Sequence, residues 1–330
     1  MILSFEQCCS IIEEQIIKTI QDFRILESPD GLYEPIDYVM KAGGKRVRPA
    51  LALMACNIFS DDIEKSFTPA LALEIFHNFT LLHDDLMDKA DVRRNRQTVH
   101  KRWNNNTAIL SGDAMMILAY RHMCRATPDI LPALLDTFNR AALQVCEGQQ
   151  YDMDFERRVD VSIGEYLNMI RLKTAALIAA SLKTGAICGG ASVENMEALY
   201  LFGVSLGISF QIQDDWLDLY ADPDVFGKNT GGDIISAKKT FLLITALERA
   251  DENKRSELTA LLHNKTISAN DKIIGVKAIY DRLEVSDAAQ KAVTEYYQQA
   301  LTHLQAVEIA DSTRIKNIKN LAEKLLKREK

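Results

Sequence analysis

The chain has 330 residues, 47% of them apolar, and a formal net charge of −7. This length and composition permit a large buried core and exclude a disordered chain. The acidic balance argues against nucleic acid as the main partner, because binding a phosphate backbone normally needs a basic surface.

Apolar residues recur at helical spacing from the start of the chain, as at Ile12, Ile16 and Ile20, to its end, as at Leu321 and Leu325. Convincing strands are absent. Turn residues divide the chain into roughly ten to twelve predicted helices. No linker or repeat is evident, so we expect a single all-α domain over residues 1–330. The turns lie at residues 28–31, 43–44, 103–106, 127–128, 189–190 and 227–232.

The sequence shows neither a signal peptide nor an apolar run that approaches the ~20 residues of a membrane span. We therefore expect a cytoplasmic protein without stable membrane insertion. Its cysteines are scattered and form no C-x-x-C pair, which indicates reduced structural thiols. They are Cys8, Cys9, Cys56, Cys124, Cys146 and Cys188.

Two aspartate clusters stand out, at residues 84–88 and 214–218. In each cluster the first and last aspartates are four positions apart, so they share one helix face and repel each other. Mg²⁺ would relieve this repulsion, because it binds one or two carboxylates and completes its shell with phosphate and water. A lone acidic cluster is usually a solvated helix face. Here, however, both clusters have apolar surroundings, in the preceding segments 79–83 and 208–213.

Four basic segments suit a diphosphate ligand, at residues 43–49, 93–94, 171–174 and 227–228. Each is weak evidence alone. The pair Gly43-Gly44 could be only a helix stop, and Arg93-Arg94 only exposed charge. It is their combination with the two aspartate clusters that points to a function.

Together these motifs resemble those of the trans-prenyltransferases, the polyprenyl synthetase family. They follow the family order from about residue 43 to 240, and the helical pattern agrees over the whole chain. The matching segments are G-G-K-R-x-R-P at 43–49, H-D-D-x-x-D at 83–88, D-x-R-R at 91–94, K-T at 173–174, F-Q-x-x-D-D-x-x-D at 210–218 and G-K-x-x-G-x-D at 227–233.

The resemblance implies a bundle of about ten or more helices around a deep cavity, with the aspartate clusters facing each other across its mouth. It also implies a homodimer, for which helical stretches such as 108–120, apolar on more than one face, give a permissive hint. The implied reaction is the Mg²⁺-dependent head-to-tail condensation of isopentenyl diphosphate with dimethylallyl, geranyl or farnesyl diphosphate.

Site roles also follow from the resemblance. Asp84, Asp88, Asp214 and Asp218 would bind Mg²⁺, about three ions with substrate bound. Asp85 and Asp215, which point around the helix from their partners, would support them. Arg93, Lys173 and Lys228 would contact the allylic diphosphate. Lys45, Arg48, His77 and Arg94 would form the isopentenyl diphosphate pocket, although His77 could be only a core histidine. Thr174 and Gln211 would face the allylic cation, and Lys238 and residues 327–330 would help to close the site.

Product length is implied by the two residues that stand five and four positions before the first aspartate, Phe79 and Thr80. In the family, bulky residues there cap the tunnel that receives the growing chain. The cluster also lacks the two-residue insertion of many bacterial farnesyl diphosphate synthases. We therefore expect C20 products, with C15 close behind. On an ideal helix Phe79 lies about 140° from Asp84, so its position in the tunnel rests on the resemblance alone.

Three alternative functions account for part of this pattern. A class I terpene cyclase would typically mix Asn/Asp, Ser/Thr and Glu in its second metal motif, and would not need the segment 43–49. A non-catalytic partner subunit of a prenyl synthase should show broken motifs, and here every acidic and basic position is filled. A structural cation-binding protein would leave the basic segments unexplained.

Overall fold

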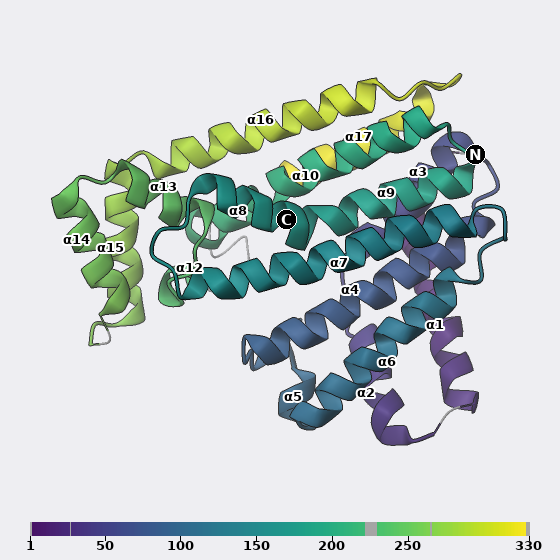
Figure 1. Ribbon diagram of the computed structural model, residues 1–330, viewed down its shortest axis with the longest axis horizontal. Coiled ribbons are helices and arrows are strands. Elements are labelled where there is room, and N and C mark those ends of the chain that lie inside the picture. The colour runs from purple at the N-terminus through teal and green to yellow at the C-terminus, as the bar shows by residue number, and fades with distance from the viewer. Residues whose placement is uncertain (1, 27, 222–229, 265, 328–330) are drawn as a thin grey trace. The chain divides into compact units, whose positions relative to one another are not determined.

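The structure is a computed structural model in which residues 2–26, 28–221, 230–264 and 266–327 are described (Figure 1). The chain divides into two compact units, and each is considered by itself. Unit 1 comprises Met1–Asn139, Ala180–Leu199 and Val307–Ile318, and unit 2 comprises Arg140–Ala179, Tyr200–Ala306 and Lys319–Lys330.

Unit 1 is built on two helices that are apolar on nearly all sides. These are α3 (Val47–Phe59) and α4 (Phe67–Met87), whose side chains are mostly buried. A helix without a polar face lies inside a protein rather than on its surface. Accordingly α4 packs against α1, α3 and α6. The other elements of this unit are α1 (Phe5–Leu26), α2 (Asp30–Met40), the 3₁₀ turn η1 (Glu64–Ser66), α5 (Val99–Arg102) and α6 (Asn105–Met123).

A short β-hairpin follows α4, and the sequence analysis did not predict it. Strands β1 (Val92–Arg93) and β2 (Arg96–Gln97) pair antiparallel. The two residues between them, Arg94 and Asn95, have φ angles of 51° and 59°. Positive φ at both central residues is typical of a two-residue hairpin turn. Strands of two residues are too short to show an alternating pattern, so no strand could be predicted here.

Unit 2 holds a second hydrophobic core, formed by α8 (Ile163–Ile170), α13 (Phe241–Arg249), α15 (Ala269–Arg282) and α16 (Val285–Gln305). Helix α8 begins with a capping box in which Ser162 and Glu165 satisfy each other's backbone amides. The remaining elements of this unit are the π-helical segment η2 (Arg171–Ala175), α12 (Gly232–Ile235) and α14 (Glu252–His263).

Four long helices contribute residues to both units: α7 (Leu131–Glu156), α9 (Ala176–Gly189), α10 (Val193–Tyr220) and α17 (Thr313–Lys327). The all-α prediction is confirmed. The described residues contain more helices than the ten to twelve expected, because short ones such as α5 and α12, next to the predicted turns at 103–106 and 227–232, are too brief to show helical periodicity. A single domain stays a prediction. All six cysteines are free, and no described helix is long and apolar enough to cross a membrane.

Candidate active site

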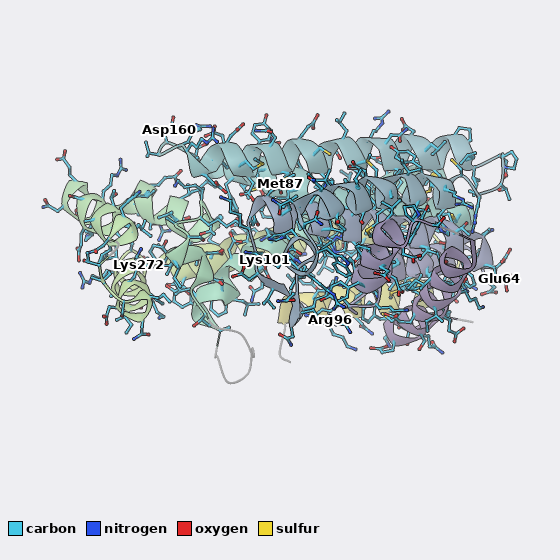
Figure 2. All side chains as sticks on the ribbon, turned by 90° about the horizontal axis from the view of Figure 1, so that it is seen from below. Glu64, Met87, Arg96, Lys101, Asp160 and Lys272 are labelled. Carbon is cyan, nitrogen blue, oxygen red and sulfur yellow. The ribbon has the colours of Figure 1, made fainter. Side chains whose placement is uncertain are left out.

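The first aspartate cluster lies at the C-terminal end of α4. The Asp88 amide donates to the Asp84 carbonyl at 2.8 Å, so these two aspartates are one helical turn apart. Asp84 is half-buried and Asp88 is exposed. Met87, within the cluster, and Arg96 and Lys101, which follow it, are exposed as well (Figure 2).

The middle carboxylate of this cluster is buried and paired with a cation. Asp85 is 6% exposed, and its Oδ1 accepts a hydrogen bond from Arg93 Nε at 2.6 Å. Arg93 Nη2 also lies 3.6 Å from Asp84 Oδ2. Burial raises the pKa of Asp85, while the Arg93 charge opposes this shift. Arg93 therefore bridges two of the three carboxylates.

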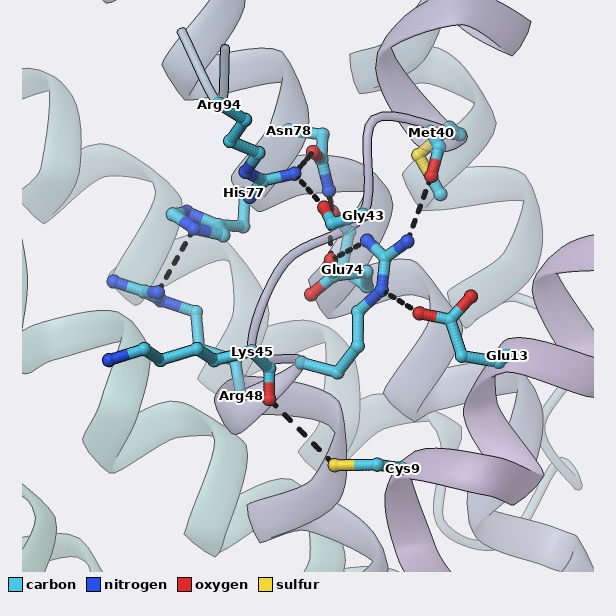
Figure 3. A network of polar contacts seen from close by, with 11 residues as sticks. Cys9, Glu13, Met40, Gly43, Lys45, Arg48, Glu74, His77, Asn78 and Arg94 are labelled. Carbon is cyan, nitrogen blue, oxygen red and sulfur yellow. Dashed lines mark hydrogen bonds and ion pairs between the residues drawn. The ribbon is translucent and has the colours of Figure 1, made fainter. Parts of the chain in front are cut away.

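The conformation of the basic segment at residues 43–49 is stabilised by an arginine for which no role was predicted. Arg46 is 4% exposed and has a φ of 47°. Its guanidinium donates to Glu13 Oε1 at 2.6 Å, to Glu74 Oε1 at 2.5 Å and to the Met40 carbonyl at 2.8 Å (Figure 3). Because these contacts satisfy the buried charge, Arg46 anchors the loop, and the exposed Lys45 precedes it.

Three residues predicted to bind isopentenyl diphosphate gather beside this loop (Figure 3). Arg48 Nη1 lies 3.0 Å from His77 Nε2. Arg94 donates to the Gly43 carbonyl and lies 3.4 Å from Asn78 Oδ1. Gly44 has a φ of +141°, which favours glycine, and a Cβ there would meet the Arg94 guanidinium carbon at 2.9 Å and displace the end of that side chain.

Electrostatics make this group suited to an anion. Burial, reinforced by the Arg48 charge, lowers the pKa of His77 well below its usual range, so the ring is neutral at pH 7. Burial and the charge of Arg94 lower the pKa of Arg48 to about 10. Like charges crowded in a partly buried place raise each other's free energy, and a bound anion would relieve that cost.

The second aspartate cluster lies near the C-terminal end of α10, and its middle carboxylate is held by neutral donors. Asp215 is 6% exposed. Its Oδ2 accepts from the Tyr166 hydroxyl at 2.6 Å and from the Phe241 amide at 3.1 Å. Its Oδ1 accepts from Gln211 Nε2 at 3.0 Å. Burial raises the pKa of Asp215 to about 6, although these donors favour its charged form.

The outer aspartates of this cluster differ in their surroundings. Asp214 is exposed and Asp218 is half-buried. Asp218 Oδ2 accepts from the Asp233 amide at 3.0 Å, and its backbone carbonyl accepts from the Gly231 amide at 2.6 Å. Burial and the neighbouring Asp215 raise the pKa of Asp233 to about 7, and the positive charge of Lys238 opposes this.

A π-helical segment in unit 2 carries Lys173 and Thr174. Lys173 Nζ lies 2.6 Å from Asp152 Oδ2, and the Thr174 hydroxyl donates to Gln211 Oε1 at 3.0 Å. Two glycines admit this wider turn. A Cβ at Gly148 would come within 2.7 Å of Lys173 Cα, and one at Gly207 within 2.5 Å of Ala175 Cα. Single π-helical turns are frequent at functional sites.

Comparison with known proteins identifies the family of this chain. The family model described as polyprenyl synthetase matches residues 29–283. The chain belongs to the polyprenyl synthetase family. A short chain isoprenyl diphosphate synthase of Methanothermobacter thermautotrophicus is 35% identical over 302 residues, which cover 91% of this chain and 90% of that protein. A geranylgeranyl diphosphate synthase of Sulfolobus acidocaldarius is 35% identical over 303 residues, 91% of each chain.

Solved structures agree with this assignment. A crystal structure of geranylgeranyl pyrophosphate synthase is 38% identical, with a TM-score of 0.93, and covers 99% of this chain and 100% of that one. The geranylgeranyl pyrophosphate synthetase of Pyrococcus horikoshii is 33% identical, with a TM-score of 0.90 over 98% and 97% of the two chains. As a member of this family, the protein is a prenyltransferase.

The donor set of this polyprenyl synthetase fits Mg²⁺. Within the described part of the chain no three His, Cys, Asp or Glu side chains converge into a self-contained metal site. Mg²⁺ does not require such a site, because it is usually bound through one or two carboxylates plus substrate phosphates. The exposed Asp88 and Asp214 and the half-buried Asp84 and Asp218 suit that mode.

The residues predicted to set product length lie on α4, one turn before the first aspartate cluster. Phe79 is 8% exposed. Its ring centroid lies 5.4 Å from that of Phe76 and 4.8 Å from that of His83. The Thr80 hydroxyl donates to the His77 carbonyl at 2.8 Å. Phe79 thus belongs to an aromatic row along this helix.

Some functional contacts escaped the sequence analysis. Asp152 and Tyr166 bind predicted site residues, but each is a single polar side chain in an otherwise ordinary helix, so spacing gave no signal. Lys228 and the C-terminal residues 328–330 lie outside the described residues. Lys238 is described and exposed.

Proposed function

We propose that this chain condenses isopentenyl diphosphate with allylic diphosphates in an Mg²⁺-dependent reaction, with C20 as the main product and C15 close behind. The observation that carries this proposal is the group of Arg48, His77 and Arg94 beside the 43–46 loop. It offers a positive diphosphate site additional to the two aspartate clusters. Ionisation of one allylic substrate would not require it, whereas condensation of two diphosphates would.

In the proposed reaction the allylic C–O bond breaks and its electron pair leaves with the diphosphate. The double bond of isopentenyl diphosphate then forms the new C–C bond to the allylic cation, and a proton passes to the released diphosphate. Catalysis must stabilise the charge that develops on the leaving group. Asp84, Asp88, Asp214 and Asp218 would hold about three Mg²⁺ ions, which supply positive charge there.

Cationic side chains of the protein would bind the substrate diphosphates directly. We assign Arg93 and Lys173 to the allylic diphosphate. The carboxylates Asp85 and Asp152 hold these two cations at 2.6 Å each, so they are oriented before substrate arrives. Lys228 remains assigned to the same group by the family pattern, and Lys238 would help to close over the charged substrates. Lys45, Arg48, His77 and Arg94 would bind isopentenyl diphosphate.

The relatives do not favour a terpene cyclase, a non-catalytic subunit or a structural cation-binding protein. The relatives reported above are named as isoprenyl or geranylgeranyl diphosphate synthases rather than as cyclases. Other relatives of similar identity are named for a longer product, such as the geranylfarnesyl diphosphate synthase of Aeropyrum pernix, which is 34% identical. Product length therefore needs its own test.

The decisive experiment incubates purified protein and Mg²⁺ with labelled isopentenyl diphosphate and dimethylallyl, geranyl or farnesyl diphosphate. We expect C20 as the main dephosphorylated product on chromatography. Absence of turnover with every primer would overturn the proposal.

The isopentenyl diphosphate site is tested at Arg48. In the variant Arg48→Ala the KM for isopentenyl diphosphate should rise on the order of 10–100-fold, with the KM for the allylic substrate nearly unchanged. The exposed Lys41, paired with Asp37, provides the control Lys41→Ala.

Product length is tested at Phe79. If its ring closes the product tunnel, Phe79→Ala should lengthen the product beyond that of the parent protein. The control is Phe67→Ala, because Phe67 begins the same helix and is half-buried. An unchanged product distribution would remove Phe79 as the residue that limits chain length.

We propose that the protein is a homodimer that uses α6. Ile109, Leu110, Met116 and Ile117 on this helix are 44%, 59%, 36% and 66% exposed, and their spacing of seven places them along one side. Ile117→Glu should shift the mass measured by light scattering towards the monomer. The control Ile274→Glu changes a similarly exposed residue on α15. A cytoplasmic location stays a prediction.

A further inference from the structure

A continuous chain of hydrogen bonds in unit 2 joins a buried tyrosine to Thr174. It runs from the Tyr166 hydroxyl to Asp215 Oδ2 at 2.6 Å, continues from Asp215 Oδ1 to Gln211 Nε2 at 3.0 Å, and ends with the Thr174 hydroxyl and Gln211 Oε1 at 3.0 Å. Tyr166 is 1% exposed and Asp215 is 6% exposed. No motif in the sequence marks Tyr166.

The chemistry of these groups fixes the direction of every proton in the chain. An ionised carboxylate only accepts hydrogen bonds, so Gln211 must turn its NH₂ group towards Asp215. Its carbonyl oxygen then faces Thr174 and can only accept. The single hydroxyl proton of Thr174 is therefore committed to Gln211. On the side away from Gln211, the Thr174 hydroxyl oxygen therefore presents only lone pairs.

We propose that Tyr166 is a positioning residue for the condensation: through Asp215 and Gln211 it holds the Thr174 hydroxyl with its lone pairs directed at the allylic cation. This inference rests on the proposed function, which supplies the cation. A hydroxyl oriented this way stabilises a neighbouring positive charge, whereas the reversed hydroxyl would repel it. Preorganised dipoles of this kind act without reorganisation at the moment of reaction.

The surroundings keep the chain of hydrogen bonds in one arrangement. The Phe241 amide donates to the same Asp215 oxygen as Tyr166, at 3.1 Å, so the carboxylate is held at three points. Burial raises the pKa of Tyr166 well above its usual range, and its hydroxyl therefore stays a donor. Since Asp215 is shielded from water, a lost donor is not readily replaced by solvent.

The first test is Tyr166→Phe, which keeps the ring and removes the donor. We expect the single-turnover rate of condensation with geranyl diphosphate to fall roughly 10-fold, with the KM for isopentenyl diphosphate within about 2-fold of wild type. The matched control is Tyr220→Phe, because Tyr220 also donates to an aspartate, Asp281, at 2.8 Å. This control should leave the rate within about 2-fold. An unchanged rate in Tyr166→Phe would overturn the inference.

A double-mutant cycle separates positioning from general stability. Thr174→Val removes the hydroxyl at constant shape, and Thr174→Ser retains it. If Tyr166 acts through Thr174, Tyr166→Phe should have almost no further effect on the rate in Thr174→Val, but its full effect in Thr174→Ser. Equal effects in both backgrounds would show that Tyr166 acts only structurally.

Binding supplies a measurement independent of turnover. The probe is an allylic diphosphate analogue in which a protonated amine replaces the carbon that becomes cationic, and its reference is the neutral carbon isostere. Tyr166→Phe should weaken binding of the ammonium analogue by roughly 10-fold and leave the neutral isostere unchanged. Equal changes for both ligands would contradict the inference. Failure of wild-type protein to condense its substrates would instead refute the proposed function.

Discussion

The two aspartate clusters share a sequence pattern, but different partners stabilise their buried middle carboxylates. In unit 1 the buried Asp85 is neutralised by a cation, Arg93. In unit 2 the buried Asp215 is held by the tyrosine, glutamine and backbone donors of its network, all of them neutral. The pKa of Asp215 rises to about 6, and that of the nearby Asp233 to about 7. The same motif thus sits in an arginine-rich region in one unit and in a carboxylate-rich region in the other.

This difference indicates how each region is prepared for a charged ligand. Unit 1 holds arginines against each other and against Glu74, so an added anion lowers the free energy of the group. Unit 2 holds carboxylates close together, so an added cation does the same. The comparison therefore predicts that removing a buried carboxylate charge will raise stability less in unit 1, where an arginine balances it, than in unit 2.

The largest effect is expected at the buried arginine of unit 1. In Arg46→Met the free energy of unfolding should fall by about 3–5 kcal/mol, because Glu74 is left buried without its ion pair. The neighbouring exposed residue gives the control, since Lys45→Met should change stability by less than about 0.5 kcal/mol. Chemical denaturation measures both. Similar losses in the two variants would show that Arg46 is not the anchor of this loop.

The next effect concerns the backbone of unit 2. Gly148→Ala should lower the free energy of unfolding by about 2–3 kcal/mol and reduce kcat, because the added methyl group overlaps the backbone at Lys173. Gly164→Ala, whose methyl group would meet nothing within 4 Å, should be neutral or slightly stabilising. Wild-type kcat in Gly148→Ala would mean that the π-helical turn is not needed for the site.

The pH dependence of stability sharpens the comparison of the clusters. The folded-state pKa of Asp233, about 7, exceeds the ordinary value near 4. Ionisation of Asp233 therefore lowers the free energy of unfolding. This loss is absent below about pH 4 and complete above about pH 7. Without Mg²⁺, Asp233→Asn should be more stable than wild type by about 1–2 kcal/mol at pH 8, and equal to it near pH 4. This figure is below ~1.4 kcal/mol per pKa unit, because the side chain keeps some access to water.

The matched variant in unit 1 should respond less to pH. Burial raises the pKa of Asp85 as well, but the charge of Arg93 opposes this shift. Asp85→Asn should therefore gain less stability relative to wild type between pH 4 and pH 8 than Asp233→Asn does. Denaturation curves at both pH values measure the two changes. An equal gain in both variants would erase the distinction between the two clusters.

The smallest effect is expected at the hairpin that carries Arg93 and Arg94. The Tyr38 hydroxyl donates to the Gln97 carbonyl at 2.9 Å. Tyr38→Phe should cost about 1 kcal/mol of stability and raise the KM for isopentenyl diphosphate by roughly 2–5-fold. Tyr120→Phe, which removes a similar bond to Asn139, should cost the same stability without changing this KM. A KM that changes equally in both variants would argue against hairpin positioning.

Much of the fold followed from local patterns. Helical periodicity predicted the all-α class, and the four-residue spacing placed Asp84 and Asp88 one turn apart, as the hydrogen bond between their backbones shows. The β-hairpin did not follow, because strands of two residues leave no periodic signal. Nor did the π-helical turn, because it depends on room created by Gly148 and Gly207, which are far from it in the sequence.

The sequence by itself determined the helical class, the family and the chemical types at the site, since periodicity and motif spacing are local properties of the chain. Only the tertiary structure decided which groups those residues meet. It made Arg46 an internal anchor while Arg48 and Arg94 lie beside His77 and Gly43, and it gave Asp85 a cation but Asp215 a tyrosine. The physical reason is that burial and hydrogen-bond partners are set by side chains from distant elements, and these cannot be derived from spacing along a single helix.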